Sequence, residues 1–271
     1  MIKNITLGQY FPGNSVIHRL DARMKLVLVI AVIVLIFMAR TVIGNAVVLA
    51  FLTAIIIMSR ISIKFVLRGI KPLWFIILLT FVLNTFFHQG GTELFSWWIF
   101  RVSEEGLISA VRLAARLIFL ITATTMLTLT TSPISLTDGL ESLMKPLKVI
   151  RFPVHELAMM MTIAMRFIPT LLQETDRIMK AQMSRGADFE SGNIVRRARN
   201  MVPLLVPLFV SAFRRADELA LAMESRCYRG GQGRTRMKIL AMTRLDLYAG
   251  IAALLLAAAV IADNVWGGML L

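Results

Sequence analysis

Five long apolar runs, separated by shorter polar stretches, constrain the fold of this chain more than any other feature of its sequence. The runs occupy residues 26–39, 42–58, 72–87, 107–129 and 247–262. A helix needs roughly 20 apolar residues to cross the hydrocarbon core of a bilayer, so the shorter runs need flanking residues to complete a span. The chain is 57% hydrophobic, above the roughly 45–50% that is usual for soluble domains. We therefore predict an all-α, polytopic membrane protein with about five transmembrane helices.

The basic residues lie in the gaps between these runs and predict which side of the membrane each gap faces. If the N-terminus is cytoplasmic and all five runs cross, the gaps on that side are 1–25, 59–71 and 132–245. These gaps contain 26 of the 30 Lys and Arg residues, the excess that cytoplasmic loops of membrane proteins carry. The net charge of +14 is not gathered on one face as it is in DNA-binding proteins. We therefore expect a lipid bilayer around the chain and no nucleic-acid partner.

The basic gaps divide the chain into three predicted regions. Residues 1–131 form an N-terminal transmembrane region with about four spans, 132–245 form a cytoplasmic module, and 246–271 form a C-terminal transmembrane helix. The module is predicted to hold three helices, at 135–149, 154–185 and 193–226, with Ser135 as the N-cap of the first. Apolar stretches in the second and third helices are interrupted by Arg166, Pro169, Pro203 and Pro207, so a count of six or seven spans stays open.

Both long helices of the module end in a Ser-Arg step, in the strings "AQMSRGADF" and "LAMESRCYRGG". An arginine in the last turn and a glycine just past it suit a helix end, which alone explains one copy. Two copies favour a docking role, because a guanidinium can bind a partner's carboxylate with two parallel hydrogen bonds. Cys227 stands where the first copy has Gly186. We therefore expect a glycine cap after the first helix and a later turn, near Gly230, after the second.

The sequence shows no catalytic centre. It has no set of metal-ligating side chains and no pair of nucleophile and base, and "GGQGRTR" lacks the spacing of a phosphate-binding loop.

Arg112 and Arg116 lie in or near the fourth run. We expect Arg112 to extend to the interface and Arg116 to be a structural or pathway residue. The many methionines of the second module helix fit a core and an adaptable partner surface equally well.

Three stretches resemble the T component, or transmembrane coupling subunit, of energy-coupling factor transporters: "SVIHRLDARMKL", "IAMRFIPTLLQETDRIMKAQMSRGADF" and "ADELALAMESRCYRGGQGRTR". The resemblance covers nearly the whole chain. It implies a non-catalytic subunit in a bacterial cell membrane that works with two ABC-type ATPases and a small S component, which captures a vitamin or other micronutrient. ATP and Mg²⁺ would be bound by the ATPases and no cofactor by this chain. The family's Ala-Arg-Gly docking motifs correspond to Ser184, Arg185 and Gly186, and to Ser225, Arg226 and Cys227.

Two other transporter classes fit an apolar chain of this size. A conventional ABC permease forms its own substrate path and has one short coupling helix per subunit, so the two long helices of the module argue against it. A secondary transporter or channel usually has paired intramembrane charges, or broken helices at matching positions in two halves. The sequence shows neither feature.

Overall fold

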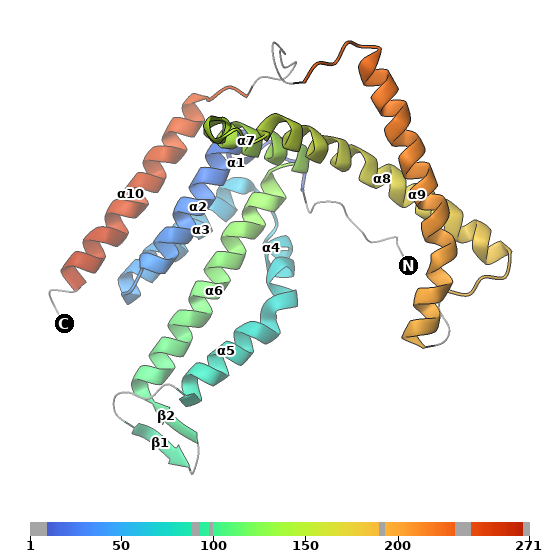
Figure 1. The fold of residues 1–271 in the computed structure, drawn as a ribbon. Helices are drawn as coiled ribbons and strands as arrows, with labels where there is room; N and C mark the ends of the chain where they lie inside the picture. The colour runs from blue at the N-terminus through green and yellow to red at the C-terminus, as the bar shows by residue number, and fades with distance from the viewer. Residues whose placement is uncertain (1–9, 88–92, 98–99, 190–192, 231–239, 268–271) are drawn as a thin grey trace. The chain divides into compact units, whose positions relative to one another are not determined.

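The computed structural model describes residues 10–87, 93–97, 100–189, 193–230 and 240–267 (Figure 1). By their internal contacts these residues form two compact units. We call the described residues of 8–140 and 239–271 the transmembrane unit, and those of 141–238 the helical unit. The helix α7 (Pro133–Met144) contributes to both units. The partition into 1–131, 132–245 and 246–271 stays a prediction.

Long apolar helices build the transmembrane unit. In the described part of the chain four stretches are long and apolar enough to cross a membrane: Val42–Ser59 (α3), Ile63–Phe87 (α4 to α5), Glu104–Thr130 (α6) and Arg244–Trp266, which is nearly all of α10 (Arg244–Gly267). A fifth apolar helix, α2 (Ala22–Met38), has 17 residues, which is about the shortest length that spans a bilayer. Together these helices match the five predicted apolar runs and confirm the fold class.

The third spanning stretch begins earlier than the apolar run at 72–87 suggests. The basic gap before it folds into α4 and a 3-10 helix that leads into α5: Ile63–Ile70, Lys71–Leu73 and Trp74–Phe87. Val66 of α4 is buried, while Lys64 and Arg68 are exposed. A Cβ on Gly69 would lie 2.7 Å from the Thr125 hydroxyl, so the glycine lets α4 approach α6 closely.

The core of the transmembrane unit lies where α2, α3, α6 and α10 meet. Ile36, Val48 and Val260 are fully buried there, and Phe119 and Ala123 of α6 join the same apolar cluster. Lipid tails are as apolar as these side chains, so close van der Waals packing is what favours their contact within a bilayer. We call the end of this unit where α2 and α10 begin the proximal end, and the opposite end the distal end.

Polar caps close the distal end. The Asn264 side chain donates to the Met38 carbonyl at 2.7 Å, and the Thr41 hydroxyl, which caps α3, donates to Asp263. Arg116 of α6 donates to the Ala39 carbonyl at 3.3 Å and lies over the Phe37 ring. Arg116 therefore donates a hydrogen bond to a carbonyl at the end of α2. This contact fits a structural residue better than a residue on a transport pathway.

Two short strands follow α5 at the distal end, Glu93–Trp97 (β1) and Phe100–Ser103 (β2), paired antiparallel. This hairpin is a small addition to an otherwise helical chain (Figure 1). We expect Trp97 and Trp98 to lie at the membrane interface, and Trp98 lies outside the described residues. Ser103 then caps α6 by accepting a hydrogen bond from the Gly106 N–H at 3.0 Å.

The helical unit is dominated by two helices of 31 residues each, α8 (Val154–Ser184) and α9 (Ile194–Glu224). Both predicted helices are confirmed to within two residues at each end. The prolines at 169, 203 and 207 lie inside the helices without ending them. Arg215 of α9 and Glu174 of α8 form an ion pair at 3.4 Å where the helices pack together. Among the described residues, neither α8 nor α9 qualifies as a membrane span.

The shorter predicted helix at 135–149 is divided in two. It consists of α7 (Pro133–Met144) and a 3-10 helix, η2 (Lys145–Ile150). The predicted N-cap, Ser135, is wrong, because its backbone N–H donates to the Ser132 hydroxyl at 3.2 Å. Ser132 is the capping residue, since Pro133 can start the helix without a backbone N–H to satisfy.

Candidate functional site

The first predicted docking tip ends α8 in a glycine cap. The Gly186 N–H donates to the Met183 carbonyl and the Ala187 N–H donates to the Gln182 carbonyl, both at 3.0 Å. Gly186 has a φ of 87°, in the left-handed region that glycine adopts without strain. This bond pair is the Schellman motif, which satisfies the last carbonyls of a helix. The expected glycine cap is confirmed.

The second tip repeats this geometry with a cysteine. The Cys227 N–H donates to the Glu224 carbonyl at 2.8 Å and the Tyr228 N–H donates to the Met223 carbonyl at 3.0 Å. Cys227 has a φ of 56°. The expectation that the second helix turns later, near Gly230, is therefore wrong. The two hydrogen bonds outweigh the roughly 1–2 kcal/mol that a side chain costs in this conformation.

The cap motif gives both arginines the same position. Arg185 and Arg226 each directly precede the left-handed residue, and each backbone N–H is bonded back into the helix, to Gln182 and Met223 respectively. All six predicted docking residues are exposed: Ser184, Arg185, Gly186, Ser225, Arg226 and Cys227. Within the described part of the chain neither arginine has an ion-pair partner. Two guanidinium groups are thus held on rigid helix ends and presented outward.

The two tips lie at separate ends of the α8–α9 pair (Figure 1). Each helix of 31 residues is about 46 Å long at 1.5 Å per residue. The structure therefore does not gather the six residues into one site. It forms two small, similar sites, each of which could bind a separate partner.

One face of α9 carries apolar side chains that the described chain leaves exposed. Val202, Val206, Phe209 and Phe213 follow one another at helical spacing and are 51–68% exposed. On α8, most of the methionines are half-buried, whereas Met160 and Met183 are exposed, at 59% and 56%. Most of these methionines therefore pack within the unit, and a partner surface formed by the two exposed ones stays a prediction. The α9 face suits an apolar partner.

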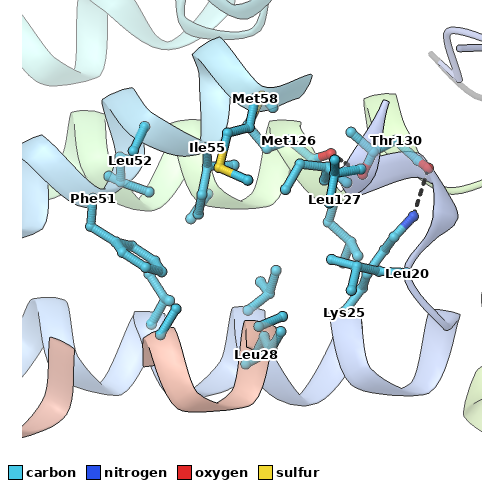
Figure 2. Close-up of a pocket in the computed structure, with 18 of the residues that line it drawn as sticks. Leu20, Lys25, Leu28, Phe51, Leu52, Ile55, Met58, Met126, Leu127 and Thr130 are labelled. Carbon is cyan, nitrogen blue, oxygen red and sulfur yellow. Dashed lines mark hydrogen bonds between the residues drawn. The ribbon is translucent and has the colours of Figure 1, made fainter. Parts of the chain in front are cut away.

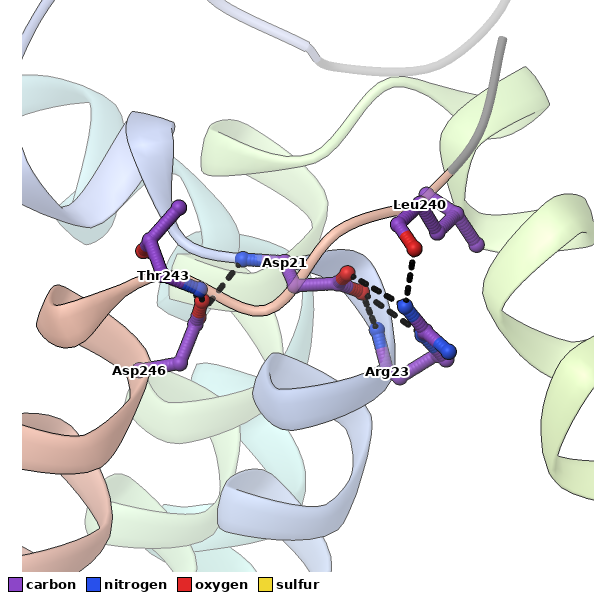
Figure 3. Close-up of polar contacts among 5 residues, drawn as sticks. All are labelled: Asp21, Arg23, Leu240, Thr243 and Asp246. Atoms are coloured by element: carbon purple, nitrogen blue, oxygen red, sulfur yellow. Dashed lines mark hydrogen bonds and ion pairs between the residues drawn. The ribbon is translucent and has the colours of Figure 1, made fainter.

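Sequence reasoning missed a polar network at the proximal end of the transmembrane unit (Figure 3). The Asp246 carboxylate accepts hydrogen bonds from the Asp21 N–H at 2.8 Å, the Thr243 N–H at 2.7 Å and the Thr243 hydroxyl at 2.8 Å. It therefore caps α10 and holds the start of α2 beside it. The Thr-x-x-Asp spacing at 243–246 is a signal for such a cap, but the sequence does not show its link to residue 21.

Arg23 and Lys25 complete this network. Arg23 donates to both carboxylate oxygens of Asp21, at 3.2 and 2.9 Å, and to the Leu240 carbonyl at 2.7 Å. The buried Lys25 ammonium donates to the carbonyls of His18 and Thr130, at 3.3 and 2.9 Å. Burial raises the pKa of Asp21, but the hydrogen bonds and positive charge of Arg23 outweigh it and lower the pKa below its usual value.

A cavity of about 360 Å³ opens beside Lys25, among α1 (Val16–Arg19), α2, α3, α6 and α10 (Figure 2). Its wall is almost wholly aliphatic and aromatic, with Leu28, Phe51, Ile55 and Met126 among the lining residues. The Lys25 ammonium, the one charged group of the lining, is already bonded to backbone carbonyls. Thr130 and Tyr248 also line it, and the Thr130 hydroxyl is bonded within its own helix, to the Met126 carbonyl at 2.7 Å.

Comparison with known proteins identifies the family. The family described as cobalt transport protein matches residues 13–238 of this chain. An energy-coupling factor transporter transmembrane protein of Thermosediminibacter oceani is 59% identical over 94% of this chain and 96% of its own length. The chain belongs to the T-component family of energy-coupling factor transporters. Proteins with the same name from Clostridium kluyveri and Bacillus subtilis are 53% and 46% identical, over 99% and 95% of this chain and 100% and 97% of their own lengths.

Membership of the T-component family confirms several of the predictions made from the sequence. The chain is the membrane component of a transporter, and it is a non-catalytic subunit because the ATPases of such transporters are separate proteins. A multi-pass membrane protein fits both this family and the apolar helices. The matched region, 13–238, includes Asp21, Arg23 and Lys25 of the proximal network and both helix tips, and it ends before Asp246.

Proposed function

We propose that this T component couples two ABC-type ATPases to a small, substrate-binding S component in the membrane. ATP-driven movement of the ATPases would pass through α8 and α9 and reorient the S component, which carries a vitamin or other micronutrient. The observation that carries the proposal is the pair of exposed arginines, Arg185 and Arg226, fixed by the same cap at the ends of two long helices. Two equivalent tips suit two similar ATPase subunits.

Each tip is suited to a carboxylate on the ATPase surface. A guanidinium presents parallel N–H groups that match the two oxygens of a carboxylate. The cap fixes the backbone position from which each arginine side chain extends. The neighbouring residues Ser184, Gly186, Ser225 and Cys227 are small, so a partner surface can approach the backbone. In this proposal ATP and Mg²⁺ are bound by the ATPases, and this chain binds no cofactor.

The apolar face of α9 is the surface we assign to the S component. A membrane partner presents apolar side chains, and Phe209 and Phe213 supply the large aromatic contacts that dominate such interfaces. The basic gaps support placing the proximal end, α8 and α9 on the cytoplasmic side of a bacterial cell membrane. With this orientation the tips are on the side where ATP is available.

Charge reversal at both tips tests the proposal. In Arg185→Glu with Arg226→Glu, two attractive contacts become repulsive, so we expect ATPase association to weaken by at least about 100-fold and ATP-driven uptake to be lost. The S component should still co-purify, because its surface on α9 is unchanged. Co-purification of both ATPases and uptake at the rate of the unaltered protein would contradict the proposal.

A matched control variant changes basic residues inside α8, before its C-terminal cap. Arg177→Glu with Lys180→Glu makes the same change in charge at exposed positions of α8, so ATPase association should change far less.

The alternative function is a conventional ABC permease with its own substrate path. Its test is transport by this chain and the ATPases without any small membrane partner, which the coupling proposal excludes.

A further inference from the structure

The segment between α7 and α8 has a surface that the coupling role does not use. We call residues 145–153 the elbow, and every one of them is exposed. The elbow presents four large apolar side chains: Leu147 at 41% exposed, Val149 at 89%, Ile150 at 76% and Phe152 at 43%. Exposing four large apolar side chains within six residues to water is unfavourable. We therefore infer that an apolar surface covers them.

The elbow is an ordered structure. The Arg151 N–H donates to the Lys148 carbonyl at 3.0 Å, and Arg151 adopts the left-handed conformation with a φ of 60°. Buried residues flank the elbow on both sides: Glu141 is 9% exposed and Val154 is 1% exposed. Glu141 also contacts His155 across the base of the elbow, with 3.4 Å between Oε1 and Nδ1. The apolar side chains are therefore held out by a folded turn.

The charge of the elbow indicates the chemistry of what covers it. Lys145, Lys148 and Arg151 are exposed among the apolar side chains, and the elbow contains no acidic residue. Basic and apolar side chains together are the pattern of segments that lie in the interface of an anionic membrane. The long stems of Lys and Arg can lie along the acyl chains while their charges reach the headgroups.

The position of the elbow in the chain favours a membrane surface over a protein. Only the two linking residues Thr131 and Ser132 and the 12-residue α7 separate it from the end of α6. In the transmembrane unit Gly139 of α7 packs on Ala22 at the start of α2, since a Cβ there would lie 3.1 Å from the Ala22 Cβ. A stable protein interface buries about 800 Å² on each partner, which is more than nine residues supply.

We propose that the elbow is an interfacial anchor that inserts its apolar side chains into the cytoplasmic leaflet and binds anionic phospholipid headgroups. The anchor fixes the start of α8 at the membrane surface. This inference depends on the proposed cytoplasmic placement of residues 132–245 but not on ATPase docking. Its test therefore uses the full chain alone, so its outcome is separate from that of the tip experiment.

Site-specific fluorescence in nanodiscs tests the anchor. Cys227 is the one cysteine of the chain, so Cys227→Ser with Ile150→Cys places a single environment-sensitive dye on the elbow. Nanodiscs of equal phosphatidylcholine and phosphatidylglycerol, with nitroxide on the acyl chains, should quench this dye strongly. Leu221→Cys in the same background is the matched control, because Leu221 is 66% exposed near the α9 tip, and its dye should stay unquenched.

Charge neutralisation tests the lipid preference. Each basic residue lost from the elbow should lower the ratio of inserted to free segment by about fivefold, so Lys145→Gln, Lys148→Gln and Arg151→Gln together should abolish the quenching. The same change at Arg166, Arg177 and Lys180 of α8 should leave it unaltered. Equal quenching at positions 150 and 221 would overturn the proposal. So would equal quenching in pure phosphatidylcholine, or shielding of the dye only after the ATPases or the S component are added.

Discussion

The proximal network and the two helix tips use basic residues in opposite ways. Arg23 and Lys25 are bonded to acceptors of their own chain, an aspartate and several backbone carbonyls. Arg185 and Arg226 are exposed on rigid helix ends and have no ion-pair partner among the described residues. Both kinds of arginine belong to stretches that resemble the same transporter family.

The difference separates residues that hold the fold from exposed residues that we propose as docking points. A buried charge is tolerated only when the chain itself supplies its acceptors, so removing one partner of a proximal contact should destabilise the packing of α1, α2, α6 and α10. An exposed charge contributes little to stability and is free to bind. The two groups should therefore respond differently to substitution, in stability for the first and in complex formation for the second.

The largest loss of stability is expected for Asp246→Ala. The substitution removes three hydrogen bonds to a buried carboxylate and leaves the N–H groups of Asp21 and Thr243 unpaired. We expect the free energy of unfolding, measured by SDS titration of the purified protein, to fall by about 4 kcal/mol. Asp217→Ala, at an exposed position of α9, is the control and should change it by less than about 0.5 kcal/mol. Equal losses in the two variants would refute the structural role of the network.

A smaller loss is expected for Lys25→Met, which keeps the length of the side chain but removes the ammonium. The carbonyls of Thr130 and His18 then lose their donor, which should lower the free energy of unfolding by about 2 kcal/mol in the same titration.

The tip variant Arg185→Met with Arg226→Met should lower the free energy of unfolding by less than about 0.5 kcal/mol and yet prevent the ATPases from co-purifying. If the tip variant loses as much stability as Lys25→Met, the contrast between the two regions does not hold.

The smallest effects concern the caps. Gly186→Ala should lower the free energy of unfolding by about 1 kcal/mol, because alanine is strained at a φ of 87°. No atom outside its immediate chain neighbours lies within 4 Å of the added Cβ, so the strain is confined to the backbone. Cys227→Gly should raise the free energy of unfolding by about 0.5 kcal/mol, since it relieves the same strain at the second tip. Changes of the same sign in the two variants would show that the tips do not share one cap geometry.

The long helices of the helical unit were the most predictable part of the chain. Their ends coincide with polar residues and, for α8, with a glycine, and these local signals predicted α8 and α9 to within two residues. The second cap was not predictable in this way, because a cysteine in the left-handed region gives no local signal. The Ser-Arg motif was nevertheless correctly placed at the end of α9.

Contacts between distant residues account for the rest of what sequence reasoning missed. Asp21 and Asp246 are 225 positions apart, so no periodicity or spacing connects them. The same holds for Arg116 and the end of α2, which are 77 positions apart. The cap of α7 was missed for a different reason: Ser132 and Ser135 are equally good capping residues, and the choice of Ser132 depends on Pro133 starting the helix.

The caps at 186 and 227 have a mechanical consequence. Because the backbone N–H of each arginine is bonded into its helix, the residue turns with the helix axis and not as part of a loop. A straight helix of 31 residues would be about 46 Å long, and the interior prolines of α8 and α9 make that an upper limit. A rotation of about 10° at one end then displaces the other by up to about 8 Å. A small tilt at either end of α8 or α9 therefore becomes a stroke longer than one helical turn.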